Sequence, residues 1–169
     1  PENSLQTLSA TPKIRLRDNK EVEPDIWEKI GELPQEIQEE LLDEAAEAEL
    51  RCNRMPRYSD YYDCSCLAMQ YLKERYEKGP NDLLFSENFT DLDLKSCVFK
   101  PSIAGLTYKH CFMFVNKQLR EEDQKEVCEC AALETAEAFA ARPRPEVRYV
   151  NNLLMSQLGS CQRQLIGRY

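Results

Sequence analysis

The sequence predicts an all-α protein in which disulfide bonds staple antiparallel helical hairpins and an extended N-terminal arm precedes them. Three observations predict this fold. Charged residues make up 31% of the chain and only 5 of its 169 residues are glycine, a composition that favours long helices over turn-rich sandwiches or barrels. Strand-like alternation of apolar and polar residues is nearly absent. Eight cysteines recur at repeated spacings.

The predicted organisation has three parts. Residues 1–33 are expected to form an extended arm that ends in a short helical turn, because they are polar and show little periodicity. An arm of this composition becomes ordered mainly by binding. Residues 34–116 are predicted to form a cysteine-paired helical hairpin unit, and residues 117–169 a second helical hairpin.

The helical turn of the arm should begin near Pro24, since proline suits the first position of a helix, with Trp27 and Ile30 as its anchors. The first long helix should run from Pro34 to about Arg54. Its apolar stripe is Ile37, Leu41, Ala45, Ala48 and Cys52.

A second helix is predicted from a cap at Ser59 or Asp60 to about Lys78, where Gly79-Pro80 stops it. After a loop and a short segment, the next helix should begin near Ile103. A long helix or broken pair continues to about Ala141, and a final helix is expected from Val147 to about Ile166.

Charge is unevenly distributed along the chain. The net charge is -8, yet residues 21–49 hold twelve Asp and Glu against the single Lys29, which gives this segment about -11 and leaves about +3 for the remainder. Such an acidic segment repels nucleic acid and anionic lipid, so no nucleic-acid partner is predicted. It is interpreted as a solvated helix face, with a basic partner as the alternative.

No apolar run approaches the ~18 residues that a membrane span needs. The N-terminus also lacks the basic start and apolar centre of a signal peptide. The chain is therefore expected to have no transmembrane span.

The first cysteine spacing places two cysteines fourteen positions apart, with a proline after the first. On a continuous helix such cysteines lie within about 40° of each other and about 21 Å apart along the axis. Two antiparallel helices of this kind could be stapled by Cys52 with Cys111 and by Cys66 with Cys97, although the prolines should kink or interrupt each segment. The two segments are Cys52-x3-Pro56-x9-Cys66 and Cys97-x3-Pro101-x9-Cys111.

A second spacing accounts for all eight cysteines as two units. In each unit a Cys-x-Cys pair is followed, after thirty residues, by another cysteine, and the later unit has five extra residues between Cys111 and Cys128. A turn at Pro143 favours Cys128 with Cys161, while the partners of Cys64 and Cys130 stay open. The two runs are Cys64-x-Cys66-x30-Cys97 and Cys128-x-Cys130-x30-Cys161.

The equally spaced cysteines between Cys52 and Cys111 resemble those of the coiled-coil-helix-coiled-coil-helix (CHCH) family of small mitochondrial intermembrane-space proteins. The family's usual spacing is nine residues, whereas thirteen separate the cysteines here, and the two prolines and the long interval from Cys66 to Cys97 are further departures. The resemblance covers about a third of the chain. It implies helical hairpins joined by two disulfides and oxidised during import.

The same resemblance implies a function and a location. Many members are accessory subunits of respiratory complexes, so this chain is expected to be a non-catalytic structural subunit of a mitochondrial inner-membrane complex, either a respiratory complex or ATP synthase. It would lie on the intermembrane-space side, peripheral to the inner membrane, with the protein subunits of that large complex as its partners.

The residues do not predict a catalytic, cofactor or metal site. His110 is the only histidine, and although it precedes Cys111, adjacent helical residues point in different directions. In principle Cys64, Cys66, Cys128 and Cys130 could form a four-thiolate zinc site, or one Cys-x-Cys pair could hold Cu(I). A thiol-active or Cu(I)/Zn-binding assembly factor is therefore the alternative function.

The cysteines are also compatible with two different compartments. Eight reduced cysteines can act as small buried hydrophobes in a cytosolic helical adaptor. A secreted disulfide-bonded protein would suit the glycosylation sequon Asn88-Phe-Thr90. Duplicated spacing disfavours the cytosolic alternative, and one sequon in a chain of this length is little evidence for the secreted one.

Overall fold

A computed structural model describes residues 24–79, 89 and 92–166. Residues 1–23 of the predicted arm and the sequon residue Asn88 lie outside these residues. The described part of the chain contains helices and a single isolated antiparallel bridge between Tyr62 and Val98, with no strand. The all-α, disulfide-stapled prediction is confirmed. The helices are α1 (Pro24–Gly31), α2 (Gln35–Arg54), α3 (Pro56–Ser59), α4 (Cys64–Lys78), the 3-10 helix η2 (Leu94–Cys97), α5 (Lys100–Phe114), α6 (Glu121–Ala141) and α7 (Val147–Ile166).

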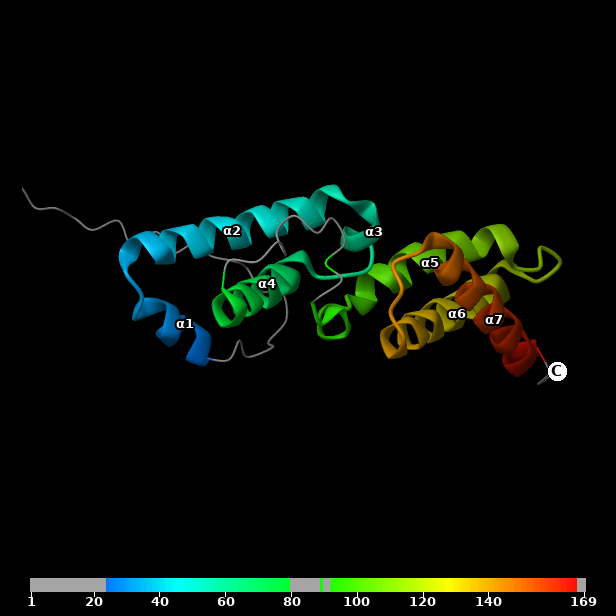
Figure 1. The fold of residues 1–169 in the computed structure, drawn as a ribbon. Coiled ribbons are helices and arrows are strands. Elements are labelled where there is room, and N and C mark those ends of the chain that lie inside the picture. Colours follow the sequence, from blue (N-terminus) through cyan, green and yellow to red (C-terminus); the bar gives the residue numbers. More distant parts are fainter. Residues whose placement is uncertain (1–23, 80–88, 90–91, 167–169) are drawn as a thin grey trace, which may run out of the picture.

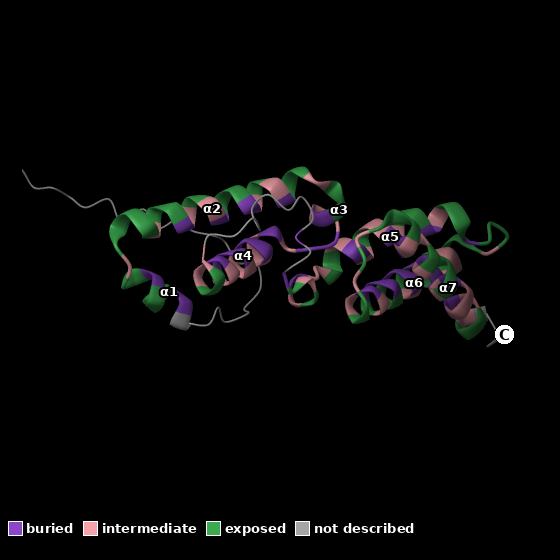
Figure 2. Cartoon of the chain, in the orientation of Figure 1, coloured by how far each residue is buried: buried purple, intermediate pink, exposed green. Residues whose placement is uncertain are grey.

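These helices form an elongated molecule (Figure 1). Helices α1, α2 and α4 lie at one end, α5, α6 and α7 lie at the other, and the short α3 lies between the two groups. Figure 2 shows that the buried residues follow the inward faces of the helices in both groups. The fold therefore consists of two helical bodies in series rather than one globular bundle.

Helix α1 begins at Pro24, where the sequence predicts it, but its buried side chains differ from the prediction. Ile26 and Ile30 are buried, whereas Trp27 is 38% exposed. Residues four apart share one face of a helix, so Ile26 and Ile30 face the core together. Trp27 lies about 100° away from Ile26 around the axis and is not the anchor expected.

Helix α2 ends at Arg54, as its prolines and apolar stripe predict. Of that stripe, Ile37 is 41% exposed and the other four residues are buried. Pro56 occupies the first turn of α3, a position where its missing N–H breaks no helical hydrogen bond. The chain therefore turns sharply after α2 and reverses its direction.

Helix α4 begins later than predicted. Its cap is Asp63 rather than Ser59 or Asp60, because the Asp63 carboxylate accepts hydrogen bonds from the backbone N–H groups of Ser65 at 2.9 Å and Cys66 at 3.1 Å. Ser59 instead ends α3. The helix ends at Lys78 as expected, and Gly79 follows with a φ of 75°, a conformation that glycine adopts readily.

The second body is an antiparallel α6–α7 pair with α5 packed against it. Helix α5 begins at Lys100, three residues before the predicted start near Ile103, because Pro101 fits the first turn instead of excluding it. Helix α6 ends at Ala141, and α7 has the predicted bounds.

The chain has two hydrophobic cores, and the division between them falls inside α5. Ile103 packs in the first core and Cys111 in the second. Phe139 and Val150, from the ends of α6 and α7 nearest the junction, reach into the first core. The second core consists of Cys111, Val115, Val127, Cys128, Ala131, Leu154, Leu158 and Cys161.

Candidate functional site, a duplicated disulfide framework

All eight cysteines lie in the described part of the chain and all are paired. Each bond joins two different elements, and the Cα atoms of the pairs are 5.4 to 6.0 Å apart, within the usual range for disulfides. The pairs are Cys52–Cys64, Cys66–Cys97, Cys111–Cys128 and Cys130–Cys161.

The two units have the same connectivity. In each, a leading cysteine bonds to the first cysteine of the Cys-x-Cys pair, at a sequence separation of 12 in the first unit and 17 in the second. The second cysteine of the pair bonds to a cysteine that follows at a separation of 31 in both units. The two-unit spacing in the sequence therefore corresponds to a repeated covalent framework.

The Cys-x-Cys spacing has a direct geometric role in helix α6. Residues two apart on a helix project about 200° apart around its axis. Cys128 therefore faces α5, where it bonds to Cys111, and Cys130 faces α7, where it bonds to Cys161. One helix is thus stapled to a neighbour on each side.

In the first unit the Cys-x-Cys pair lies in the opening turn of α4. Cys64 bonds back to Cys52 in the last turn of α2. The backbone N–H of Asp63 donates to the carbonyl of Cys97 at 2.9 Å, and that of Phe99 donates to the carbonyl of Tyr61 at 2.9 Å. This short bridge holds the segment that follows η2 beside the start of α4, where Cys66 bonds to Cys97.

Of the two disulfides predicted from the first spacing, one is present and the other prediction is wrong. Cys66 bonds to Cys97 as expected, but Cys52 bonds to Cys64 and not to Cys111. The pairing of Cys52 with Cys111 assumed one continuous helix from Cys52 to Cys66. Pro56 interrupts that helix, and the chain reversal places the start of α4 beside the end of α2.

The expected bond between Cys128 and Cys161 is also wrong. Cys161 bonds to Cys130, two residues further along α6. The α6–α7 hairpin and its turn are as predicted, but the face of α6 that meets α7 carries Cys130, while Cys128 is covered by α5. These contacts assign the two cysteines that the sequence left open, Cys64 and Cys130.

The sulfur environments differ within each unit. Five cysteines are at most 2% exposed, and Cys64 is 7% exposed, while Cys66 and Cys130 are half-buried. The second bond of each unit is therefore the more accessible one. The five most buried cysteines are Cys52, Cys97, Cys111, Cys128 and Cys161.

A charged cluster joins α2 and α4 at the end of the hairpin remote from the disulfides. Arg75 Nε donates to Glu44 Oε2 at 2.7 Å, and the Tyr71 hydroxyl donates to the same oxygen at 3.0 Å. Arg75 Nη2 also donates to Glu40 Oε1 at 3.3 Å. The hydrogen bond to Glu44 raises the pKa of Arg75, and burial is the main cause of the raised pKa of Tyr71. The sequence-based prediction did not include this cluster, although Glu40 and Glu44 one turn apart on an acidic helix are a signal for it.

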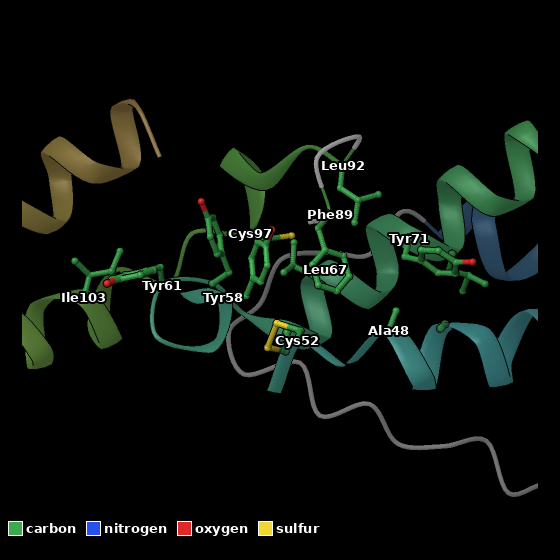
Figure 3. Close-up of a cluster of buried hydrophobic side chains, with 14 of the residues drawn as sticks. Ala48, Cys52, Tyr58, Tyr61, Leu67, Tyr71, Phe89, Leu92, Cys97 and Ile103 are labelled. Carbon is green, nitrogen blue, oxygen red and sulfur yellow. A yellow bond between two sulfur atoms is a disulfide. The ribbon is translucent and has the colours of Figure 1, made fainter. Parts of the chain in front are cut away.

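Aromatic side chains fill the junction between the two bodies. Tyr58 meets Phe89 edge to face with ring centroids 5.0 Å apart, and Tyr61 stacks on Phe139 at 5.3 Å. Figure 3 shows Tyr58 and Tyr61 in this cluster, with the side chain of Tyr61 beside Ile103 of α5. Three tyrosines within five residues of sequence, at positions 58, 61 and 62, were the available signal for this junction.

An open cavity of about 210 Å³ lies beside the first disulfide. Both of its carboxylates already have local roles, since Glu49 accepts a hydrogen bond from the Ser65 hydroxyl at 2.7 Å and Asp63 caps α4. The hydroxyl of Tyr62 is buried without a hydrogen-bond partner. The cavity is lined by Glu49, Asn53, Ser59, Tyr62, Asp63, Cys64, Ser65 and Phe99.

The residues considered for thiol or metal chemistry do not come together in one site. His110 is exposed on α5, and the neighbouring Cys111 is buried and bonded to Cys128. The two Cys-x-Cys pairs belong to different bodies, and their sulfurs are all in disulfides. Across residues 24–79, 89 and 92–166, no three His, Cys, Asp or Glu side chains are grouped in a way that suits a metal ion.

Within the same described residues, no helix combines the length and apolarity required to span a bilayer. The chain matches no protein-family model, and comparisons with curated proteins and with solved structures likewise find no match.

Proposed function

We propose that this chain is a non-catalytic structural subunit of a mitochondrial inner-membrane complex, a respiratory complex or ATP synthase, on its intermembrane-space side. The observation that carries the proposal is the pairing of all eight cysteines into two units of the same connectivity. Stable disulfides belong to oxidising compartments. Among those compartments, the resemblance of the cysteine spacing between Cys52 and Cys111 to that of the CHCH family favours the intermembrane space.

The covalent framework supports a bracing role. Each central helix, α4 or α6, is bonded to two other elements, so these elements cannot separate at the bonded positions without breaking a disulfide. Buried aromatic rings join the two bodies at Tyr61 and Phe139. A rigid, elongated element of this kind holds neighbouring subunits at a set distance, and its surface offers exposed apolar side chains at Met113 and Phe114 for such contacts.

The side chains that carry charge or unusual pKa values also support a structural role. Arg75, Glu44 and Tyr71 contact one another and join two helices. Tyr62, whose pKa burial raises, lies inside the aromatic junction. In each case the hydrogen bonds or burial that raise the pKa of the side chain come from the packing that joins the helices.

The proposal is tested with the tagged chain expressed in its native source. Mitochondria are isolated, the outer membrane is ruptured by osmotic swelling, and protease is added before and after rupture. We expect degradation only after rupture, co-migration with an inner-membrane complex on native gels, and eight thiols that react with alkylating reagent only after reduction. Recovery in the cytosol with free thiols would overturn the proposal and favour the reduced adaptor.

A second measurement separates the structural role from metal handling. The purified oxidised protein and the reduced protein are each titrated with Cu(I) and Zn²⁺ to measure metal binding. In a separate assembly assay, we expect the Cys66→Ser/Cys97→Ser variant to reduce the amount of assembled complex without changing the turnover of the complex that remains. Tight stoichiometric metal binding, with delivery of metal to the complex, would instead establish an assembly factor.

A further inference from the structure

The two units use their second disulfide to hold different kinds of element. The Cys66–Cys97 bond joins α4 to the four residues of η2, whereas the Cys130–Cys161 bond joins α6 to α7, which has 20 residues. A 3-10 helix has poorer hydrogen-bond geometry than an α-helix and occurs in short pieces. Residues 92–98, which contain η2, are here called the η2 segment.

The described contacts that hold the η2 segment against α4, besides the disulfide, are limited in extent. Gln70 Nε2 donates to Ser96 Oγ at 3.2 Å, and the backbone N–H of Asp63 donates to the carbonyl of Cys97 at 2.9 Å. Leu92 is buried in the first core, and Figure 3 shows it and Cys97 beside α4. Separation of the segment from α4 therefore costs these hydrogen bonds and the burial of a few apolar side chains.

The C-terminal end of the η2 segment is fixed independently of the disulfide. The backbone N–H of Phe99 donates to the carbonyl of Tyr61 at 2.9 Å. Helix α5 begins at the next residue, Lys100, and places the fully buried Ile103 in the first core. A segment held in this way pivots near Phe99 when its contacts with α4 are lost.

Helix α7 is held more extensively than the η2 segment. Val150, Leu154 and Leu158 are all at most 4% exposed and lie in the two cores, and together with Cys161 they extend over about three turns of the helix. This packing does not depend on the disulfide. Helix α7 therefore stays against α6 when its bond to Cys130 is broken.

Accessibility separates the second bond of each unit from the first. A thiolate reduces a disulfide by attacking one of its sulfur atoms, so the rate depends on access to that atom. Among the cysteines of the two first bonds, the largest exposed fraction is 7%, at Cys64. Cys66 and Cys130 are half-buried. A thiol therefore reaches the second bonds, at Cys66 or Cys130, more readily than the first bonds.

Charged neighbours do not distinguish the two second bonds. Each bond has carboxylates near its half-buried cysteine and a cation two residues from the partner cysteine in the sequence. Because negative charge predominates at both, an uncharged thiol approaches them more easily than an anionic one. The charges are Glu49, Asp63 and Lys95 for Cys66–Cys97, and Glu126, Glu129, Glu134 and Arg163 for Cys130–Cys161.

We propose that the Cys66–Cys97 disulfide is a redox-sensitive latch, which holds the η2 segment on α4 and is opened by an uncharged low-molecular-mass thiol. The thiolate of the reductant attacks Cys66 Sγ, the bond to Cys97 breaks, and the Cys97 thiolate takes up a proton. A second reductant thiolate attacks the reductant sulfur of the mixed disulfide, and Cys66 leaves and is protonated. Two reductant thiols are thereby oxidised to one disulfide, and the protein disulfide is reduced to two thiols.

Reduction has different consequences at the two accessible bonds. In the first unit Cys97 moves away with the η2 segment, so the two thiols are no longer held together and the reduced state persists. In the second unit α7 keeps Cys161 next to Cys130, so the effective concentration of one thiol at the other stays high and the bond re-forms. The latch goes beyond the bracing role proposed above, because one unit responds to reductant while the other stays closed.

The first test equilibrates the purified, oxidised full chain with mixtures of reduced and oxidised 2-mercaptoethanol under native conditions. Acid quenching, alkylation and peptide mass spectrometry measure the reduced fraction of each bond. We expect Cys66–Cys97 to be half reduced at a ratio of thiol to disulfide at least about tenfold lower than the ratio for Cys130–Cys161. Opening of Cys130–Cys161 at the same or a lower ratio would overturn the proposal, and so would reduction of all four bonds in one step.

The second test weakens a non-covalent contact of the η2 segment and leaves every cysteine in place. Gln70→Ala removes the hydrogen bond to Ser96, which is present only while the segment lies on α4. One net hydrogen bond corresponds to about fivefold in an equilibrium constant, so Cys66–Cys97 should be reduced about fivefold more readily. The matched control is Gln164→Ala, which removes a hydrogen bond to Ser160 within α7 and should have no effect on this bond. An unchanged equilibrium in Gln70→Ala would show that the segment stays on α4 after reduction and would overturn the latch.

The third test measures the opening by amide hydrogen exchange. In Cys66→Ser/Cys97→Ser, the Asp63 amide, which donates to Cys97, should exchange at least about tenfold faster than in the parent, while the Phe99 amide keeps its protection. In the matched variant Cys130→Ser/Cys161→Ser, the amides of α7 between Val150 and Leu158 should keep theirs. Equal loss of protection in the two variants would overturn the contrast between the units. The parent chain, reduced and alkylated only at Cys66 and Cys97, gives the same measurement without substitution.

These outcomes are separable from those that test complex membership, because they are measured on the purified chain. A chain that co-migrates with an inner-membrane complex but keeps the Asp63 amide protected after reduction overturns the latch and leaves the structural role in place. A chain recovered outside mitochondria whose Cys66–Cys97 bond opens first overturns the proposed function and leaves the latch in place.

Discussion

The ring of Tyr61 stacks on that of Phe139, with centroids 5.3 Å apart and an interplanar angle of 30°. Tyr61 follows α3 and Phe139 lies in the last turns of α6, so this contact joins the two helical bodies where no disulfide crosses. Phe139 is fully buried and also approaches Tyr62 and Tyr149. The Phe139 side chain therefore contacts aromatic rings of both disulfide-stapled units.

Replacing Phe139 by alanine should reduce the free energy of unfolding by about 3 to 5 kcal/mol, the usual cost of removing a fully buried phenylalanine. Because the ring lies at the junction, we also expect the single unfolding transition of the parent to separate into two. Denaturant unfolding followed by circular dichroism and by tyrosine fluorescence measures both effects. Leu133→Ala, at a side chain 56% exposed on the same helix, is the control and should change stability by less than about 0.5 kcal/mol.

The charged cluster between α2 and α4 should contribute more than a surface ion pair. Arg75→Ala removes a guanidinium whose side chain is 10% exposed and leaves Glu44, at 17% exposure, without its main partner. Hydrogen bonds to charged groups are worth about 1.5 to 3 kcal/mol, so a loss of that size in the free energy of unfolding is expected. Lys100→Ala breaks an exposed pair with Glu137 and should cost at most about 1 kcal/mol. Equal losses in the two variants would contradict a partly buried cluster.

The sequence predicts several elements closely because their limits depend on local chemistry. The end of α2 before Pro56 and the bounds of α7 follow from proline, glycine and the periodicity of apolar residues. The two-unit cysteine spacing likewise anticipates the repeated framework. These features can be predicted without knowing which helices pack together, so the sequence alone is sufficient to predict them.

The pairing of cysteines and the junction depend on contacts that the sequence does not encode locally. Cys130 rather than Cys128 meets Cys161 because α5 occupies the other face of α6, and that choice is decided only when three helices pack together. The partner of Cys52 likewise depended on how sharply the chain reverses after Pro56. Tyr61 and Phe139 lie too far apart in the chain for any local pattern to relate them.

Buried tyrosines should make the fold sensitive to alkali. Tyr62 and Tyr71 are each 1% exposed, and burial is the main reason that the pKa of each is raised above the ordinary value of 10.0. A raised pKa in the folded state means that stability is full below the unfolded pKa near 10 and falls as pH rises toward the folded pKa. The slope is up to about 1.4 kcal/mol per pH unit for each tyrosine.

Stability measured by rapid denaturant unfolding at successive pH values should therefore be flat up to about pH 9 and fall above about pH 10. Tyr71→Phe removes one of the two groups and should make the decline shallower, while the absolute stability also decreases because the hydrogen bond to Glu44 is lost. An unchanged slope in Tyr71→Phe would contradict a raised pKa at this position. Tyrosinate absorbance in the folded protein measures the ionisation directly.

The disulfide connectivity makes a prediction that distinguishes neighbouring cysteines. In a Cys130→Ser variant the thiol left free should be that of Cys161, because these two residues are bonded. In Cys128→Ser it should be that of Cys111. The free thiol is identified by maleimide labelling under denaturing, non-reducing conditions, followed by peptide mass spectrometry. This assay does not require cleavage of the chain between Cys128 and Cys130. A label on Cys161 in Cys128→Ser would contradict the framework.

The same framework predicts unequal losses of stability when whole bonds are removed. In the chain-entropy description, a bond that closes a longer loop restricts the unfolded chain more. The Cys66–Cys97 bond has a sequence separation of 31 and the Cys52–Cys64 bond has one of 12. Replacing both members by alanine should therefore cost about 4 kcal/mol for the first and about 3 kcal/mol for the second. Both variants are compared with the parent by denaturant unfolding without reductant, and a larger loss for the shorter loop would show that native packing around Cys52 outweighs chain entropy.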